Sequence, residues 1–260
     1  MSEDEPAFEG RRPEAQESEI LRAARAGALV LFCDFDGTFS QRDVGGALAR
    51  EYLPELRAAL QERYQRGELS AWEYALELFD GFAFDAERLN AFLGKIELDP
   101  GAHRLVEWCR RRRVAFLILS DGFDFNLERL QAIHSVKFSY SANHLTFERG
   151  HWKIRPGGLN ATCGCGTGMC KRGVIEKYRA DHPRAYCIHV GDGRVSDFCG
   201  AEAADLVFAK GSLASALRSH GIPFEAFESL DDVRSVLERT LQRSSGRRAF
   251  GSRASGDFQR

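Results

Sequence analysis

Asp34 and Asp36 stand two positions apart at the end of an apolar run, residues 29–33, and Gly37 and Thr38 follow them. The run predicts a strand that is covered on both faces. Two carboxylates so close together raise each other's pKa, and a hard divalent cation relieves that cost because it binds oxygen ligands. The pair therefore predicts a metal site with one carboxylate left for chemistry. The alternative is an ordinary turn, in which Asp and Gly are common for conformational reasons.

Two further apolar runs of strand length, residues 114–119 and 186–190, also end in polar residues. Between them, a predicted helix over residues 171–180 begins with Lys171. Ligands of an open parallel sheet bind beyond the carboxyl ends of its strands, so we expect these segments to converge on one site. The polar residues concerned are Ser120, Asp121 and Gly122 after the second run, and Asp192 and Asp197 after the third.

Phosphoryl transfer is the chemistry that suits this set of side chains. The Ser120 hydroxyl, the backbone N–H groups beside it and the Lys171 ammonium can bind phosphate oxygens. Asp34 can attack phosphorus and form an aspartyl-phosphate. Asp36 can protonate the leaving oxygen and then activate the hydrolytic water. Asp192 can complete the shell of a magnesium ion that neutralises charge on the transferring group.

In type, order and spacing these motifs resemble the haloacid dehalogenase superfamily of phosphatases, over residues 28–240. The resemblance implies that Asp34 is the nucleophile and a Mg²⁺ ligand. It also implies that Asp36 is the acid and base and binds the metal through its backbone carbonyl. The remaining implied roles are metal binding by Asp192 and Asp197, the latter directly or through the water shell, and phosphate binding by Ser120, Asp121, Gly122 and Lys171.

The sequence departs from the superfamily pattern at two places. Asp121 stands where many relatives have glycine, so we expect its carboxylate to point away from the phosphate pocket or to meet a cation. Asp197 lies one residue further from Asp192 than in phosphoserine phosphatase relatives, which leaves its role open. Asp36 itself argues against a dehalogenase, which has no leaving group that needs a proton.

The predicted fold is α/β, a three-layer Rossmann-like core around a parallel sheet, with a small helical cap inserted after the first strand. Apolar residues recur every four positions through residues 48–64, which predicts helices. We expect the core to comprise residues 28–42 and 97–242 and the cap to comprise residues 43–96. Residues 1–27 and 243–260 are polar without an apolar period, and we expect them to be disordered tails.

Arg42 and Asp43 lie where the predicted cap begins, just past the nucleophile loop. Either can recognise the part of the substrate that carries no phosphate. The alternatives are a hinge or, for Asp43, the N-cap of the first cap helix, a position that Asp favours.

A predicted β-hairpin over residues 140–154 precedes a cysteine- and glycine-rich segment. Cys163, Cys165 and Cys170, with His144 or His151 nearby, offer ligands for zinc. Their spacing is not the paired Cys-x-x-Cys pattern. The alternative, which we favour, is a glycine-rich turn with small buried thiols that lets the backbone approach the phosphate.

Two groups of superfamily members resemble this chain in detail. Residues 166–171 resemble the phosphoethanolamine and phosphocholine phosphatases. Gly37 with Thr38, Asp43 and residues 204–210 resemble the methionine-salvage phosphatases, which act on a phosphorylated methylthio-ketopentenyl compound. Phosphoserine also remains open as a substrate.

Composition is that of an ordinary globular protein, with 28% charged and 43% hydrophobic residues among 260. The net charge of −2 gives no electrostatic argument for nucleic acid, and no apolar stretch is long enough to cross a membrane. The odd number of cysteines, 7, and the acidic N-terminus predict a reduced, cytoplasmic protein. We therefore expect a phosphomonoester hydrolase whose partner is a small phosphorylated molecule. The alternatives are a phosphotransferase with the same intermediate and a non-catalytic phosphate-binding regulatory module.

Overall fold

A computed structural model describes residues 14–250 of the chain. The strands are β1 (Leu29–Asp34), β2 (Ala115–Phe123), β3 (Ser139–Glu148), β4 (His151–Arg155), β5 (Tyr186–Gly191), β6 (Leu206–Ala209) and β7 (Glu225–Ala226). They form one seven-stranded sheet in the order β4-β3-β2-β1-β5-β6-β7. Only the β3–β4 pair, the predicted hairpin, is antiparallel. The parallel sheet that the apolar runs predicted is confirmed.

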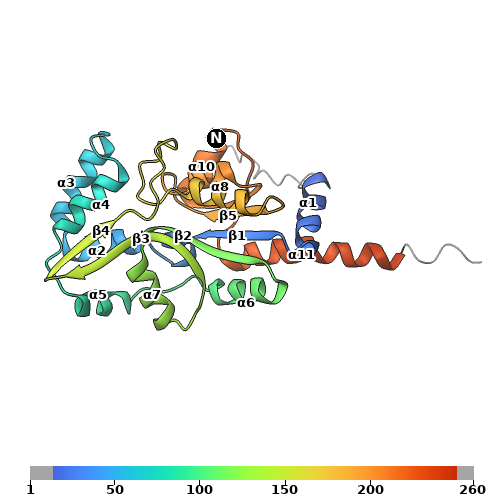
Figure 1. The fold of residues 1–260 in the computed structure, drawn as a ribbon, viewed down its shortest axis with the longest axis horizontal. Coiled ribbons are helices and arrows are strands. Elements are labelled where there is room, and N and C mark those ends of the chain that lie inside the picture. The colour runs from blue at the N-terminus through green and yellow to red at the C-terminus, as the bar shows by residue number, and fades with distance from the viewer. Residues whose placement is uncertain (1–13, 251–260) are drawn as a thin grey trace, which may run out of the picture.

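Helices cover both faces of this sheet (Figure 1). All six residues of β1 are buried. Leu31 packs in one hydrophobic cluster and its neighbour Phe32 in another, because successive side chains of a strand point to opposite faces. The first cluster includes side chains of α1 (Glu14–Arg25), α6 (Ala102–Arg112), α7 (Asp124–Ile133) and α11 (Leu230–Phe250). The opposite face carries α8 (Lys171–Asp181), α9 (Phe198–Ala203) and α10 (Gly211–Ser219). The predicted three-layer core is confirmed.

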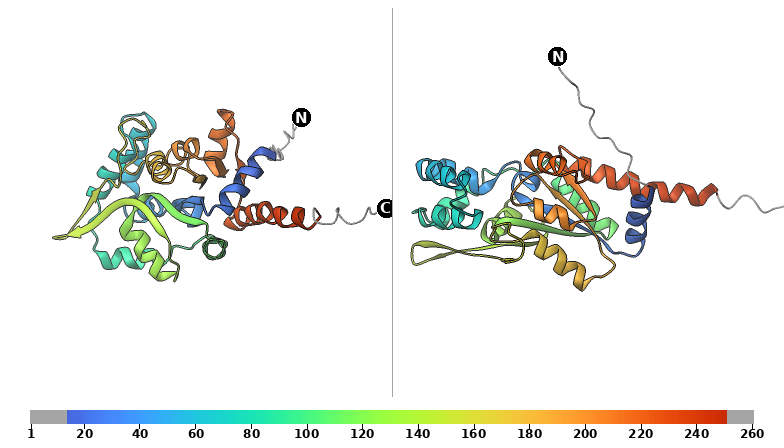
Figure 2. Two further views of the ribbon diagram at one scale, coloured as in Figure 1. Left: turned by 45° about the vertical axis from the view of Figure 1, so that its right-hand side comes forward. Right: turned by 90° about the horizontal axis from the view of Figure 1, so that it is seen from above.

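A helical insertion follows β1 and the short irregular helix η1 (Phe35–Phe39). It consists of α2 (Val44–Tyr52), α3 (Pro54–Gln65), α4 (Ala71–Asp80) and α5 (Ala86–Leu93). Figures 1 and 2 place it at one end of the sheet, with α1 and α11 at the other. The helices expected for the cap are therefore present, and the boundaries at residues 43 and 96 stay a prediction.

A short neck joins this insertion to the core. The outgoing and returning segments run antiparallel, with Ser40 opposite Leu98. The Gln41 N–H donates to the Glu97 carbonyl at 2.9 Å. A second tie runs through the hairpin, where the Trp152 indole N–H donates to the Phe84 carbonyl at 2.7 Å. The insertion is thus held both at its base and along the β3–β4 hairpin.

The prediction that residues 1–27 and 243–260 are disordered tails is wrong in part. Residues 14–25 form α1, whose Ile20 and Ala23 are buried against the core. Two apolar positions are too few to produce a recognisable helical pattern in the sequence. At the other end, α11 continues to Phe250, past the expected boundary at residue 242. The disorder predicted for residues 1–13 and 251–260 concerns residues outside the part of the chain that the structure describes. Within residues 14–250, no helix is both long and apolar enough to span a membrane.

Candidate active site

The predicted site residues meet at the carboxyl ends of the three central strands. In the sheet register Asp34 lies opposite Leu119 of β2, the residue before Ser120. Cys33 lies opposite Val190 of β5, two residues before Asp192. The chain leaves β1 toward β2 and returns to its other side as β5, so the site sits where the strand order switches, the usual place for a ligand in such sheets.

Lys171 lies between two carboxylates at the centre of the site. Its side chain is 0% exposed, and its ammonium pairs with Asp34 Oδ1 and, at 2.5 Å, with Asp197 Oδ1. Burial and the charge of Asp197 raise the pKa of Asp34, while Lys171 opposes that shift. Burial alone would lower the pKa of Lys171, but the charges of Asp197 and Asp34 raise it, so the ammonium stays charged. The lysine is therefore a fixed positive charge beside the expected nucleophile.

The Asp36 carboxyl group is held between the helical insertion and the end of β2. The Val44 N–H, in the first turn of α2, donates to its Oδ1 at 2.7 Å. The Ser120 hydroxyl donates to its Oδ2 at 3.3 Å. Burial and the charge of Asp43 raise the pKa of Asp36 to about 7. Such a pKa suits a group that must give up and take back a proton near neutral pH.

Asp192 approaches Asp34 from β5, and η1 makes room for it. Gly37 has φ +82°, and a Cβ there would lie 2.6 Å from Asp192 Oδ2, so only glycine suits the position. The Thr38 hydroxyl donates to Asp192 Oδ1 at 2.9 Å. Carboxylate oxygens of Asp34, Asp192 and Asp197 all lie within 4.8 Å of one another, and we call these residues the carboxylate cluster. This all-oxygen donor set fits a hard divalent cation such as Mg²⁺.

Asp197 is 0% exposed, and both of its oxygens already have partners. Oδ1 accepts from Lys171 and lies 3.0 Å from His189 Nε2. Oδ2 accepts from the Gly193 N–H at 2.9 Å and the Asp192 N–H at 3.3 Å. Burial opposes it, yet Lys171 and His189 hold the pKa of Asp197 below its ordinary value. With these partners its carboxylate orients Lys171 and the loop after β5, and its part in metal binding stays a prediction.

The second motif forms the irregular last part of β2 rather than a loop beyond it. The Gly122 N–H donates to Ser120 Oγ at 2.9 Å. The Asp121 carboxylate accepts hydrogen bonds from neutral donors: the Gly168 N–H at 3.0 Å, the Met169 N–H at 3.2 Å and the Asn143 amide at 3.1 Å. Burial raises the pKa of Asp121, while its hydrogen bond from Asn143 opposes that shift. Asp121 therefore ties the segment before α8 to the strand end that carries Ser120.

Arg42 and Asp43 take up the alternative roles considered for them. Asp43 caps α2, with its Oδ1 accepting from the Gly46 N–H at 2.9 Å, so the N-cap prediction is confirmed. Arg42 donates to the Lys95 carbonyl at 3.0 Å and so links the two sides of the neck. Their part in substrate recognition stays a prediction.

Two residues of the site carried no role in the sequence analysis. Thr38 follows Gly37 in the motif after the first strand, and its hydroxyl donates to the Asp192 carboxylate. His189 stood in an apolar strand run, and a buried imidazole there needs a polar partner, which is Asp197. Burial lowers the pKa of His189, so the ring is neutral at neutral pH, although Asp197 opposes the shift.

The three cysteines singled out for zinc come together, and a fourth joins them. Sulfur atoms of Cys163, Cys165, Cys170 and Cys199 all lie within 4.8 Å of one another, and we call these residues the cysteine cluster. Neither histidine considered with them takes part. His144 instead pairs with Asp124 through Nδ1 at 2.8 Å.

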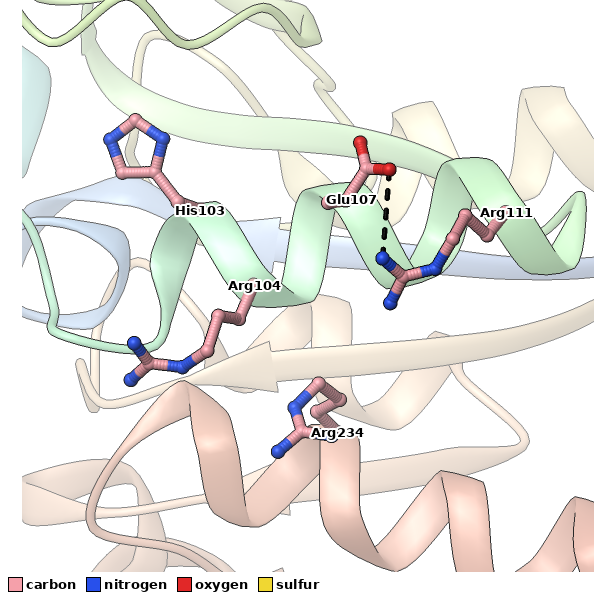
Figure 3. Close-up of a pocket in the computed structure, with 5 residues that line it drawn as sticks. All are labelled: His103, Arg104, Glu107, Arg111 and Arg234. Atoms are coloured by element: carbon pink, nitrogen blue, oxygen red, sulfur yellow. Dashed lines mark ion pairs between the residues drawn. The ribbon is translucent and has the colours of Figure 1, made fainter.

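A surface pocket elsewhere is lined by none of the predicted site residues. Figure 3 shows it between α6 and α11, lined by His103, Arg104, Glu107, Arg111 and Arg234. Its arginines are already paired: Arg104 with Asp231, Arg111 with Glu107 and Arg234 with Glu238. The chemistry therefore belongs to the strand ends.

Comparisons with known proteins show the family of this chain. The sequence pattern of the haloacid dehalogenase-like hydrolases matches residues 31–202. The chain is 30% identical over 224 residues to a 2-hydroxy-3-keto-5-methylthiopentenyl-1-phosphate phosphatase of Brevibacillus brevis, covering 82% of this chain and 97% of that one. A protein of the same name from Bacillus cereus (strain AH187) is 25% identical, covering 83% and 98%.

Solved structures give the same fold. A substrate-bound phosphoserine phosphatase complex superimposes with a TM-score of 0.61 at 19% identity, covering 82% of this chain and 97% of that one. A phospho-aspartyl intermediate analogue of phosphoserine phosphatase gives 0.60 at 18% identity, covering 82% and 98%.

Proposed function

The chain belongs to the haloacid dehalogenase-like hydrolases, and from that premise we propose that it is a magnesium-dependent phosphatase of a small phosphorylated metabolite, acting through an aspartyl-phosphate on Asp34. The observation that carries the proposal is that Asp34 and Asp36 lie in different electrostatic environments. Asp34 is paired with the buried Lys171, as a nucleophile beside phosphate oxygens needs. Asp36 is held instead by the Val44 N–H and the Ser120 hydroxyl and has a pKa of about 7, as a proton donor needs.

In the first step a carboxylate oxygen of Asp34 attacks phosphorus, and the bond from phosphorus to the ester oxygen breaks. Protonated Asp36 donates its proton to the departing oxygen, so an alcohol leaves and an aspartyl-phosphate remains. The Lys171 ammonium, the Ser120 hydroxyl and the backbone N–H groups that follow it hold the phosphate oxygens.

In the second step Asp36 returns to its first state. Its carboxylate takes a proton from water, and the water oxygen attacks phosphorus. The bond from phosphorus to Asp34 breaks, inorganic phosphate leaves, and both aspartates are ready for another turnover. A phosphotransferase would differ only in the acceptor, an alcohol in place of water.

Asp34 and Asp192 are the residues that would hold Mg²⁺ with their carboxylates, since burial raises the pKa of both and neither is saturated with donors as Asp197 is. The bound ion supplies positive charge that offsets the charge on the transferring group. Asp197 is the residue we propose to position Lys171, because its oxygens are committed to Lys171, His189 and the loop after β5.

The helical insertion is proposed to close over the bound substrate and exclude water. Its first helix contacts the proposed acid and base directly, because the Val44 N–H at the start of α2 donates to the Asp36 carboxylate. A movement of α2 would therefore be felt at the acid and base as well as at the substrate.

The first substrate to try is 2-hydroxy-3-keto-5-methylthiopentenyl-1-phosphate, because the relatives that match over 97% and 98% of their length carry it in their names. A panel would add phosphoserine, phosphoethanolamine, phosphocholine and pyridoxal phosphate, each with Mg²⁺ and with excess chelator.

We expect release of many phosphates per chain from at least one compound, with Mg²⁺ only. An added alcohol that gains the phosphate faster than water would point to a phosphotransferase. No release from any compound in either condition would contradict the proposed activity.

A further inference from the structure

Four thiols that the proposed reaction does not use gather beside the N-terminus of α8. They are the cysteine cluster: Cys163, Cys165, Cys170 and Cys199. All four are free, although their sulfur atoms lie within 4.8 Å of one another. Cys170 and Cys199 are buried, and the other two are half-buried. Packing alone does not explain why four thiols, one of them from a distant segment of the chain, lie so close together.

Three segments of the chain bring these thiols together. Cys163 and Cys165 lie on the segment before α8, where Gly164 and Gly166 have φ of +66° and +68° and let the backbone reverse direction. Cys170 is the N-cap of α8. Cys199 lies in α9, two residues after Asp197. The glycine-rich turn that the sequence analysis favoured is therefore present, and its thiols face a fourth from a distant segment.

Hydrogen-bond partners surround the sulfur atoms, as they do around thiolates that bind metal. The Gly173 N–H donates to Cys170 Sγ at 3.4 Å. Burial raises the pKa of the Cys199 thiol, and a hydrogen bond from the Arg172 N–H to its sulfur opposes that shift. The Thr167 hydroxyl lies 3.2 Å from Cys165 Sγ. Among the described residues, this cluster contains no histidine or carboxylate, so its ligands are all soft.

Four soft ligands with this spacing match a tetrahedral site. Zn–S bonds of about 2.3 Å place tetrahedral sulfur atoms about 3.8 Å apart. The observed limit of 4.8 Å needs only a small contraction, which rotations of the side chains can supply. Four protein ligands fill the shell and leave no position for water or substrate, which is typical of a structural rather than a catalytic ion.

We propose that the cysteine cluster binds one Zn²⁺ ion as a closed tetrathiolate site. The ion joins α9 to the start of α8, and so fixes the segments that carry Asp197 and Lys171. It also holds the loop that supports the helical insertion, because the Trp72 N–H of α4 donates to the Gly166 carbonyl at 2.9 Å. Its role is to position these elements, and it takes no part in the phosphoryl transfer.

The metal content of the purified full-length chain, kept under reductant, tests the site directly. We expect one zinc per chain by mass spectrometry of metals, released when a mercurial titrates the thiols. The Asp34→Asn variant should retain that zinc, which separates this proposal from the proposed activity. Iron in place of zinc, or no bound zinc after incubation of folded protein with zinc salt, would overturn it.

Matched double variants locate the ion. Cys163→Ala/Cys165→Ala should lose the zinc, whereas Cys109→Ala/Cys187→Ala, which removes two thiols outside the cluster, should retain it. Zinc retained by the first variant would overturn the assignment.

Replacement of zinc by Co²⁺ in the unmutated chain covers the case in which a variant fails to fold. We expect the visible absorption bands of tetrahedral cobalt bound to thiolates. A spectrum of octahedral cobalt with oxygen ligands would overturn the site.

Discussion

The carboxylate cluster and the cysteine cluster are neighbours in the fold, yet the chain places them by different means. Asp34 is the last residue of β1 and Asp192 directly follows β5, and the hydrogen-bond ladder of the sheet fixes where those strands end. Cys163 and Cys165 lie on a loop, and Cys199 lies in a six-residue helix. The sheet therefore positions the first cluster, whereas the second depends on a loop and a short helix and would gain more stability from a bound ion. We therefore expect loss of the first to abolish activity and loss of the second to lower stability.

The largest effect is expected for Asp34→Asn. Removal of a nucleophile usually leaves only the contribution of binding, so phosphate release should fall by roughly 10⁴-fold or more. The thermal midpoint should not fall, because burial and Asp197 make the Asp34 charge unfavourable in the folded chain. Steady-state rates and thermal unfolding of the two proteins test both statements. Activity within tenfold of the unmutated enzyme would break the comparison, because the carboxylate cluster would not then be the catalytic one.

The cysteine cluster should behave in the opposite way. An ion present at 100 times its Kd adds about 2.7 kcal/mol of stability, so Cys163→Ala/Cys165→Ala should lower Tm by about 5–10 °C. The activity that remains at low temperature should fall far less than in Asp34→Asn. Calorimetry with and without added zinc measures the effect, with Cys109→Ala/Cys187→Ala as the control. A Tm that does not depend on zinc in the unmutated chain would contradict it.

Much of the carboxylate cluster could be predicted from the sequence, because an apolar run that ends in an acid is a local signal. The strand order then brings such ends together. The cysteine cluster could be predicted only in part, since Cys199 reaches it through the packing of α9 on α8. His189 was missed for a similar reason: its partner Asp197 is set by the fold after β5. Helix α1 was missed because a single fully buried isoleucine anchors it.

Asp121 ties the segment between Cys165 and Cys170 to the end of β2, and its loss should have an intermediate effect. Its Oδ1 accepts hydrogen bonds from Gly168, Met169 and Asn143. Asp121→Ala leaves these buried donors unpaired, which should lower the free energy of unfolding by about 1–3 kcal/mol. Asp121→Asn retains an acceptor oxygen and should lose less. Urea unfolding compares the three proteins, and equal stability of Asp121→Ala and the unmutated chain would show that the connection is not needed.

The smallest effect is a pH dependence at His189, which faces Asp197 and Lys171. Its pKa is 6.5 when unfolded and lower in the folded chain, chiefly through burial. Below pH 6.5 the unfolded chain therefore binds more protons, and stability falls as the pH falls, by at most about 1.4 kcal/mol per pH unit. His189→Gln retains a donor for Asp197 and should lose less stability between pH 7.5 and pH 5.5, on the order of 1 kcal/mol less. Parallel pH profiles for the two proteins would exclude this contribution.

The central claim is that Asp34 carries the phosphoryl group between the two steps. The most direct measurement mixes the enzyme and Mg²⁺ with the best substrate of the panel, labelled with ³²P, and stops the reaction in acid. We expect label bound to the unmutated protein, and hydroxylamine should release it as it releases an acyl phosphate. The label should be absent from Asp34→Asn and should persist longer in Asp36→Asn. Turnover without bound label, or label that persists in Asp34→Asn, would contradict the account.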